Sequence, residues 1–299
     1  KHADNPAALG TLILFTGSNG KLNLLTNWPT DQAGLTTHDT DSSSNFLVRQ
    51  RNNLAASGFN VILMNDFKAE PEALRVSELA AVEKVLRSGR YVLGKEVRAF
   101  EEAWAKRCDV AHAVGVGNGL DAIEIGLRVL RIGPGDEVIT TPMTAFATVL
   151  AIIRAGAEPV LADIDSRTAL LDPSSAERCI TDRTKGLLLV HLYGQIREMD
   201  RWTDLCRKHN IALLEDCAQS HLARWGGRAG GSFGSLGAYS FYPTKNLGAI
   251  GDAGALVSHD EMLMANARKL RNYGQSARYE HPELGLNSRL DELQASLLL

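Results

Sequence analysis

The sequence contains little cysteine, and its cysteines do not form the pattern of a metal site or a disulfide-bonded scaffold. Its 299 residues include four cysteines, and none of these forms a C-x-x-C pair. Zinc sites and small secreted scaffolds rely on such pairs or on dense cysteine, so neither is predicted and no metal ligand is assigned. We therefore expect a reduced, cytoplasmic setting. The four cysteines are Cys108, Cys179, Cys206 and Cys217.

Long apolar runs and a charge excess of either sign are also lacking. No stretch approaches the ~18 consecutive apolar residues of a membrane span. The formal net charge of −3 indicates neither a nucleic acid nor a membrane as a partner. The 44% of hydrophobic residues and the chain length suit a globular protein of two domains. The chain begins at Lys1 and has no signal-peptide pattern, which is compatible with a fragment.

From about residue 111 to 257, short strand-like runs alternate with helix-like periods. This alternation predicts an α/β fold with a mainly parallel sheet flanked by helices. The predicted strands are 111–116, 137–141, 159–162, 186–191, 211–215, 236–241 and 255–257. The predicted helices are one that includes Leu120 and Leu130, and those at 146–155, 199–209 and 262–272.

The first 64 residues differ from the rest in composition. We predict a strand at 11–15, a long polar stretch at 27–44, a helix at 46–57 and a strand at 60–64. This order is similar to the opening of an α/β-hydrolase, in a short match. The composition changes near Asn65. We therefore divide the chain into a hydrolase-like fragment or extension, 1–64, and a second domain, 65–299.

A single lysine, Lys245, lies in the glycine-rich stretch "SFYPTKNLGAIGDAG" between two predicted buried strands. A lysine in a loop is most often simply solvated. A lysine that two strands deliver toward the interior is desolvated, loses its proton more easily and becomes a nucleophilic amine. Such an amine suits Schiff-base chemistry, provided that the chain also offers a cofactor site.

Three further stretches offer the parts of such a site, and each has a plainer explanation. In "GVGNGLDAIEIGL" (115–127), a glycine turn opens a helix whose N-terminus attracts phosphate, although glycine-rich turns are common. Asp216 follows a buried strand and is suited to a cationic ring nitrogen, or it caps the next helix. Phe146 lies at a strand-to-helix turn, where it stacks on a flat ring or packs in the core. Together with Lys245, these are the parts of a pyridoxal 5′-phosphate (PLP) site.

From about residue 66 to 299, the chain resembles the DegT/DnrJ/EryC1/StrS family of PLP-dependent nucleotide-sugar aminotransferases. The matching stretches are "SGRYVLGKEVRAFEEAWA", "VGVGNGLDAIEIGLR", "IGPGDEVITTP", "LLLVHLYGQ", "LLEDCAQSH", "SFYPTKNLGAIGDAGALV" and "LRNYGQ…LNSRLDELQA". The resemblance implies the large domain of a fold-type I PLP-transferase. Family members continue beyond "ELQASLLL" into a smaller C-terminal domain, which we expect to be largely missing.

The resemblance also implies roles for individual residues. Lys245 and Asp216 are the implied catalytic residues: Lys245 links covalently to PLP and moves a proton, and Asp216 binds the pyridinium nitrogen. The other implied contacts to PLP within one chain are Asn118, the backbone N–H groups of Gly119 and Leu120, Phe146 on the ring, Gln219 at the 3′-oxygen and Ser240 at the phosphate.

Three more residues are implied by the resemblance to act at the substrate side or between subunits. Asn287 corresponds to an asparagine that reaches the phosphate of a neighbouring subunit, which implies a homodimer with shared active sites. Tyr91 and Tyr193 correspond to residues that line the substrate cleft.

The implied function is transfer of an amino group from glutamate to a nucleotide-activated keto sugar, most like a dTDP-3-keto-6-deoxyhexose. Two alternatives stay open: a sugar dehydratase of the same family, in which histidine typically replaces the lysine, and a truncated PLP-binding remnant without turnover. An N-terminal hydrolase is disfavoured. The G-x-S-x-G pattern that starts at Gly230 lacks the strand–elbow–helix context and is interpreted as a chance match.

Overall fold

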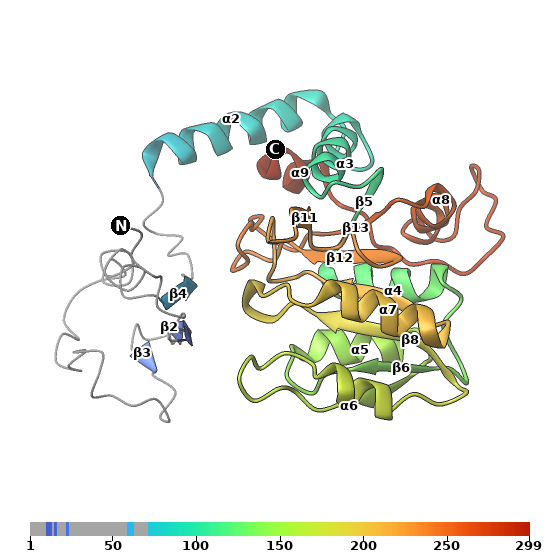
Figure 1. Ribbon diagram of the computed structural model, residues 1–299. Coiled ribbons are helices and arrows are strands. Elements are labelled where there is room, and N and C mark those ends of the chain that lie inside the picture. The colour runs from blue at the N-terminus through green and yellow to red at the C-terminus, as the bar shows by residue number, and fades with distance from the viewer. Residues whose placement is uncertain (1–9, 14, 17–21, 24–58, 63–70) are drawn as a thin grey trace. The chain divides into compact units, whose positions relative to one another are not determined.

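The computed structural model describes residues 10–13, 15–16, 22–23, 59–62 and 71–299 (Figure 1). The chain divides into two compact units, Lys1–Arg75 and Val76–Leu299. The predicted division at Asn65 is not tested by this partition alone and stays a prediction.

The first unit contains two short pairs of strands. β1 (Gly10–Ile13) pairs in parallel with β4 (Phe59–Ile62), and β2 (Phe15–Thr16) pairs antiparallel with β3 (Leu22–Asn23). The strands predicted at 11–15 and 60–64 therefore exist with shifted bounds. The polar stretch at 27–44 and the helix predicted at 46–57 lie outside the described residues, so the hydrolase resemblance stays a prediction.

The second unit is built on a seven-stranded sheet, which confirms the predicted α/β class. Its strand order is β5-β13-β12-β9-β8-β6-β7, and β13 is antiparallel to both of its neighbours whereas the other pairs are parallel. The strands are β5 (His112–Val116), β6 (Glu137–Thr140), β7 (Glu158–Leu161), β8 (Thr184–Val190), β9 (Ala212–Asp216), β12 (Leu236–Ser240) and β13 (Gly254–Ser258). All seven overlap the predicted strands.

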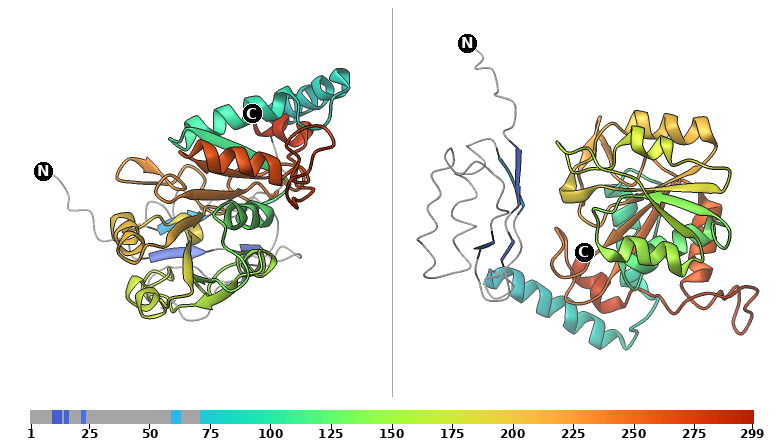
Figure 2. Two further views of the ribbon diagram at one scale, coloured as in Figure 1. Left: turned by 90° about the vertical axis from the view of Figure 1, so that its right-hand side faces the viewer. Right: turned by 90° about the horizontal axis from the view of Figure 1, so that it is seen from below.

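Helices cover both faces of this sheet, as the two views of Figure 2 show. The helices that pack on the sheet are α3 (Lys95–Arg107), α4 (Gly119–Val129), α5 (Phe146–Arg154), α6 (Pro173–Arg178), α7 (Met199–His209), α8 (Glu261–Leu270) and α9 (Glu292–Leu298). They are preceded by α2 (Glu72–Ser88), which is mostly exposed and buries Val85. A short 3₁₀ turn, η2 (Leu192–Gly194), follows β8, and a small antiparallel pair, β10 (Arg224–Trp225) and β11 (Arg228–Ala229), precedes β12.

Alternation along the strands explains why both faces are covered. On β8, Leu188 packs with α4, α5 and α8, whereas Leu187 and Leu189 pack with α6 and α7 on the other face. On β12, Ala238 joins the first cluster and Tyr239 joins a third cluster with α3 and α9. Because successive side chains of a strand point to opposite faces, these apolar strands need helices on both sides. Among the described residues, no helix combines the length and apolar character needed to cross a lipid bilayer.

Candidate active site

The loops that carry most of the predicted site residues gather at one edge of the seven-stranded sheet. β5, β6, β8, β9 and β12 all point the same way, because β13 alone is reversed. Their carboxyl ends therefore share one edge, where ligands of open α/β sheets bind. Asp216 and Ser240 end β9 and β12, while Gly119 and Phe146 begin the helices that follow β5 and β6.

The N-terminus of α4 presents unpaired backbone donors beside Ser240. Asn118 is the N-cap residue, and its side-chain oxygen accepts the N–H of Asp121 at 2.8 Å. Within residues 71–299, the N–H groups of Gly119 and Leu120 have no hydrogen-bond acceptor. A Cβ at Gly119 would lie 2.5 Å from the Cβ of Ser240, so glycine permits this close approach. Free N–H groups and the positive end of the helix dipole suit a phosphate here.

Asp216 is a buried carboxylate, 5% exposed, at the carboxyl end of β9. Thr148 Oγ1 donates to its Oδ2 at 2.8 Å, and the N–H of Ala218 donates to its Oδ1 at 3.1 Å. The next helix along the chain is α8, so the explanation of Asp216 as a helix cap is wrong. Both of these hydrogen bonds come from neutral groups, and within residues 71–299 no cationic side chain forms a salt bridge with Asp216, so the carboxylate can still pair with a cationic group of a ligand.

Lys245 lies half-buried in a loop closed at its base. The N–H of Lys245 donates to Tyr242 O and the N–H of Ala249 donates to Phe241 O, both at 2.8 Å. Burial lowers the pKa of the Lys245 ammonium, and the Asp216 carboxylate raises it by a smaller amount. The lysine is therefore not freely solvated, and its amine is shifted toward the neutral, nucleophilic form.

Phe146, Tyr193 and Gln219 surround the same edge from three loops. Phe146 is 70% exposed, so it is not a core residue. The N–H of Tyr193 donates to Gln219 Oε1 at 2.7 Å, which joins the turn after β8 to the turn after β9. Tyr193 has φ 58°, a left-handed conformation, and burial raises the pKa of its phenol. An exposed aromatic ring at the edge leaves a face free to stack on a ligand.

The sequence interpretation did not assign a role to His221 or Thr148. His221 Nε2 donates to the carbonyl of Ser240 at 2.9 Å, and burial lowers the pKa of the ring to about 4, so the imidazole is neutral near pH 7. Thr148 also contacts Thr144, with 2.7 Å between their hydroxyl oxygens. The sequence could have suggested Thr148, because it lies two residues after Phe146, on the first turn of the helix that begins at the site.

Asn287 and Tyr91 lie apart from the contacts described above within this single chain. Asn287 is exposed in the loop before α9 and pairs with Asn272 in an isolated bridge. Tyr91 is 53% exposed, and its carbonyl accepts the N–H of Glu292 at 3.0 Å. The roles implied for these two residues at the phosphate and in the substrate cleft stay predictions.

Glu215, the neighbour of Asp216, holds a loop in place. Its carboxylate, 0% exposed, accepts the N–H groups of Gly231, Phe233 and Gly234, each at 2.8 Å, and contacts His191 Nε2 at 2.8 Å. These three amides belong to the G-x-S-x-G stretch, which has a structural role here. With Cys217, Glu215 and His191 also form a group with metal-ligand atoms, but these bonds already engage both oxygens of Glu215.

The residues at this edge fit PLP in charge and in shape. A phosphate matches the free N–H groups at the α4 N-terminus, a protonated ring nitrogen matches the Asp216 carboxylate, and an aldehyde matches the Lys245 amine. The observation that carries the fit is the close packing at Gly119, where any side chain would occupy the space beside Ser240.

Comparison with known proteins gives the context for this geometry. The model of the DegT/DnrJ/EryC1/StrS aminotransferase family matches residues 72–299. The chain belongs to this family. The predicted resemblance is thereby confirmed, as is the fold-type I architecture, and members of this family depend on PLP.

Two relatives of this chain are named as sugar aminotransferases. The chain is 48% identical over 233 residues to a dTDP-3-amino-3,4,6-trideoxy-α-D-glucose transaminase of Streptomyces venezuelae, covering 78% of this chain and 62% of the relative. It is 44% identical over 237 residues to a UDP-N-acetyl-3-dehydro-α-D-glucosamine 3-aminotransferase of Acidithiobacillus ferrooxidans, covering 79% and 64%.

A solved structure agrees with these matches. The crystal structure of S. venezuelae DesV in complex with a ketimine intermediate is 47% identical, with a TM-score of 0.76, covering 79% of this chain and 64% of that chain. The chain thus spans less than two thirds of the length of the relatives it matches.

Proposed function

We propose that the protein transfers an amino group, with PLP, from glutamate to the keto group of a nucleotide-activated deoxysugar, most like a dTDP-3-keto-6-deoxyhexose. The observation that carries the proposal is the meeting of Lys245, Asp216 and the α4 N-terminus at one edge of the sheet. The names of the two sugar transaminases support the substrate class, since both refer to position 3 of a nucleotide-linked hexose.

Each residue has a defined task in this proposal. The N–H groups of Gly119 and Leu120, together with Ser240, bind the cofactor phosphate. Asp216 keeps the ring nitrogen protonated, and Lys245, once displaced by the amino donor, moves a proton to and from the substrate carbon. When bound, PLP supplies an electron sink for the breaking C–H bond.

The remaining predicted residues shape the site in this proposal. Phe146 covers the ring, Asn118 orients the α4 N-terminus and Gln219 contacts the 3′-oxygen. Tyr91 and Tyr193 line the sugar-binding side.

Lysine at position 245 favours transamination over the dehydratase alternative. Dehydratases of this family typically replace the lysine with histidine, whereas this chain keeps an amine whose pKa burial lowers. A neutral amine forms a covalent bond to an aldehyde, and an imidazole does not form the same stable link.

The test is a visible spectrum of the purified chain with PLP, followed by addition of an amino donor. The protein should be yellow, and L-glutamate should bleach the colour because the amino group moves to the cofactor, while D-glutamate serves as the matched control. A chain that takes up PLP but is bleached by no amino donor would support the non-catalytic alternative.

Residues 1–64 should be dispensable for binding PLP. All proposed cofactor contacts lie between Asn118 and Asn287, so a chain that starts at Asn65 should bind PLP with an affinity within about twofold of the full chain. Titration of the absorbance of both chains measures this. If the shorter chain has the same circular dichroism but takes up no PLP, the first residues belong to the enzyme.

Asn287 should complete the phosphate site of a second copy of the chain. Its exposed position outside its own site's contacts supports this role. In a two-fold dimer, each site would then combine Lys245 of one chain with Asn287 of the other. Mixing Lys245→Ala and Asn287→Ala chains should give heterodimers with one intact site, so about a quarter of all sites recover activity on random pairing.

The mixing experiment needs two controls. Asn287→Ala alone must be clearly impaired, and exchange of subunits is verified with a mass tag on one variant. No recovery despite exchange would place Asn287 in its own chain's loop, where an asparagine side chain commonly satisfies nearby backbone.

A further inference from the structure

Residues 287–296, here called the clasp segment, contact two loops of the candidate site and the loop that carries Tyr91, which is proposed to line the sugar-binding side. The segment includes the loop before α9 and the first turn of that helix. Its contacts reach the loop before α3, the loop of Lys245 and the turn before α4. The proposed chemistry gives these contacts no role, because Ser288, Glu292 and Gln294 are not among the residues proposed to bind the cofactor.

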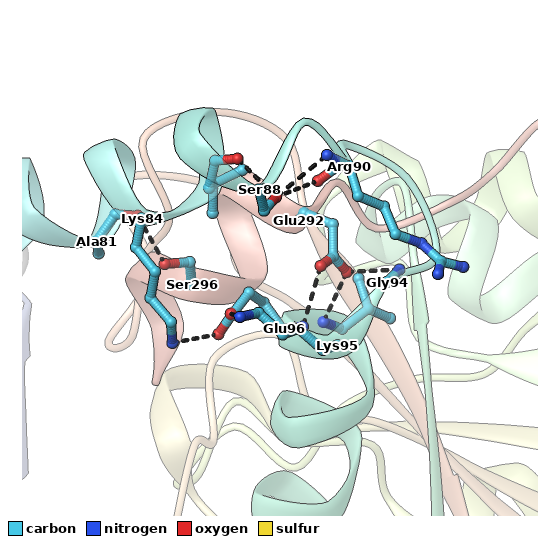
Figure 3. A network of polar contacts seen from close by, with 11 residues as sticks. Ala81, Lys84, Ser88, Arg90, Gly94, Lys95, Glu96, Glu292 and Ser296 are labelled. Atoms are coloured by element: carbon cyan, nitrogen blue, oxygen red, sulfur yellow. Dashed lines mark hydrogen bonds and ion pairs between the residues drawn. The ribbon is translucent and has the colours of Figure 1, made fainter.

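The first contact is a buried carboxylate at the start of α3 (Figure 3). Glu292 is 2% exposed, and it accepts the N–H groups of Gly94 at 2.7 Å, Val97 at 2.9 Å and Glu96 at 3.0 Å. The N-cap residue of α3, Gly94, has no side chain with which to cap the helix. Glu292, 198 residues away in sequence, therefore supplies the cap and the negative charge that a helix N-terminus favours.

The backbone of Glu292, rather than its carboxylate, also holds the backbone that carries Tyr91. The N–H of Glu292 donates to Tyr91 O at 3.0 Å, and Asp291 forms an isolated bridge with Val92. A Cβ at Gly94 would overlap Glu292 Oε2, so glycine at this position is needed for the contact. The loop of Tyr91 is thus held at Tyr91 itself and at the start of α3, which follows it.

Two further contacts shown in Figure 3 brace this region from α2. Ser296 Oγ donates to Ala81 O at 3.2 Å, and Lys84 Nζ lies 2.9 Å from Glu96 Oε2. Side chains from α2, α3 and α9 therefore join in one network, and movement of α9 would disturb all three helices.

The second contact holds the loop of Lys245. The N–H of Ile250 donates to Gln294 Oε1 at 3.1 Å. A Cβ at Gly251 would lie 2.9 Å from Gln294 Nε2, so the amide group packs directly on this backbone. Ile250 follows Ala249, whose N–H closes the loop onto Phe241. Gln294 thus holds the Lys245 loop at Ile250, one residue after the Ala249–Phe241 hydrogen bond that closes the loop.

The third contact reaches the turn before α4. The N–H of Gly117 donates to Ser288 Oγ at 3.0 Å, and the N–H of Ser288 donates to Arg271 O at 2.9 Å. Ser288 is 1% exposed, so this pair is shielded from water. The turn that presents Gly119 to the proposed phosphate is therefore held by the same segment.

We propose that Ser288, Glu292 and Gln294 are positioning residues, through which the clasp segment sets the relative placement of the phosphate turn, the Tyr91 loop and the Lys245 loop. Each residue holds one loop. Loss of one contact should therefore loosen its own loop and leave the others in place, a pattern that general destabilisation of the fold would not give.

Amide hydrogen exchange of the purified chain tests this independence directly. Gln294→Leu, which keeps the size but removes the acceptor, should raise exchange at Ile250 about fivefold or more, the effect of one lost hydrogen bond. Exchange in residues 91–97 should stay unchanged. Gln294→Glu, which keeps an oxygen acceptor, should restore protection at Ile250.

Glu292→Gln should give the opposite pattern. The amide nitrogen of the new glutamine would face a backbone N–H in place of a carboxylate oxygen, and the negative charge at the helix N-terminus would be lost. Amide exchange at the start of α3 should therefore rise about tenfold or more, while the amide of Ile250 stays protected. Gly94→Ala disturbs the same contact from the other side and is a second variant in case Glu292→Gln folds poorly. Equal increases in both loops, or no increase in either, would overturn the proposal.

A second readout, which rests on the proposed function, links the Gln294 contact to the lysine. Gln294→Leu should lower the fraction of bound PLP that borohydride fixes to Lys245, and it should leave the affinity for pyridoxamine 5′-phosphate, which has no aldehyde, within about twofold. Equal losses for both cofactors would overturn the positioning role. A parent chain that binds neither cofactor would refute the proposed function, while the exchange pattern would still decide the inference.

Discussion

Lys245→Ala is expected to abolish the covalent link between the chain and PLP. The half-buried Lys245 amine is the nucleophile that we propose for this link, and burial lowers its pKa toward the reactive neutral form. After borohydride reduction, peptide mass spectrometry should find the pyridoxyl group on the peptide with Lys245 in the parent chain and on no peptide in the variant. Amino transfer should fall by about 10²–10⁴-fold from lost proton transfer alone.

A matched control separates this effect from the loss of any lysine. Lys185 is exposed near the start of β8, at the opposite end of that strand from the site. Lys185→Ala should keep both the adduct and the activity. An unchanged adduct in Lys245→Ala would show that another amine binds the cofactor, and the assignment of Lys245 would be wrong.

Local sequence pattern was sufficient to predict the strands of the sheet, though not their order. The strands at 236–241 and 255–257 appear as β12 (Leu236–Ser240) and β13 (Gly254–Ser258), because a buried strand needs an apolar run of matching length. The helix at 199–209 appears with the same bounds as α7. Because these elements depend mainly on residues that are close in sequence, they can be predicted from one sequence without any homologues.

Contacts between distant residues were the part that the sequence did not indicate. Glu292 caps α3 from 198 residues away, and nothing in "LDELQA" distinguishes this carboxylate from a solvated one on a helix. Thr148 on Asp216 and His221 on Ser240 are likewise set by the packing of separate elements. Such contacts depend on how strands are ordered in the sheet, which periodicity does not specify.

The two neighbouring carboxylates Glu215 and Asp216 show the same limit. In the sequence they are equivalent, but β9 points them to opposite faces. Glu215 is enclosed by three backbone N–H groups and His191, whereas Asp216 has two neutral donors and lies near Lys245. The resemblance to a family assigned the site to Asp216, and the structure adds a physical reason for the difference.

Asp216→Asn is expected to lower amino transfer by about 10²–10³-fold, the usual cost of removing one electrostatic stabiliser from an active site. The amide keeps an oxygen for the N–H of Ala218 and places its NH₂ toward Thr148 Oγ1, which can accept as well as donate, so the fold should persist. The loss should fall on the rate of the chemical step, since the charge that keeps the ring nitrogen protonated is gone, and single-turnover kinetics with L-glutamate measures that step.

Asp216→Asn should also shift the pKa of Lys245, and the negative charge that it removes determines the direction of the shift. The Asp216 carboxylate raises the pKa of the Lys245 ammonium, against the larger lowering by burial. Without that carboxylate the ammonium loses stabilisation, so its pKa should fall further, and the rate of acylation of Lys245 in the cofactor-free chain should reach its plateau at a lower pH. Asp182→Asn, exposed before β8, removes an equal charge far from this edge and should leave the profile unchanged. A profile that moves to higher pH, or does not move, would mean that Asp216 does not act on Lys245, and its proposed pairing with the cofactor ring would lose its electrostatic basis.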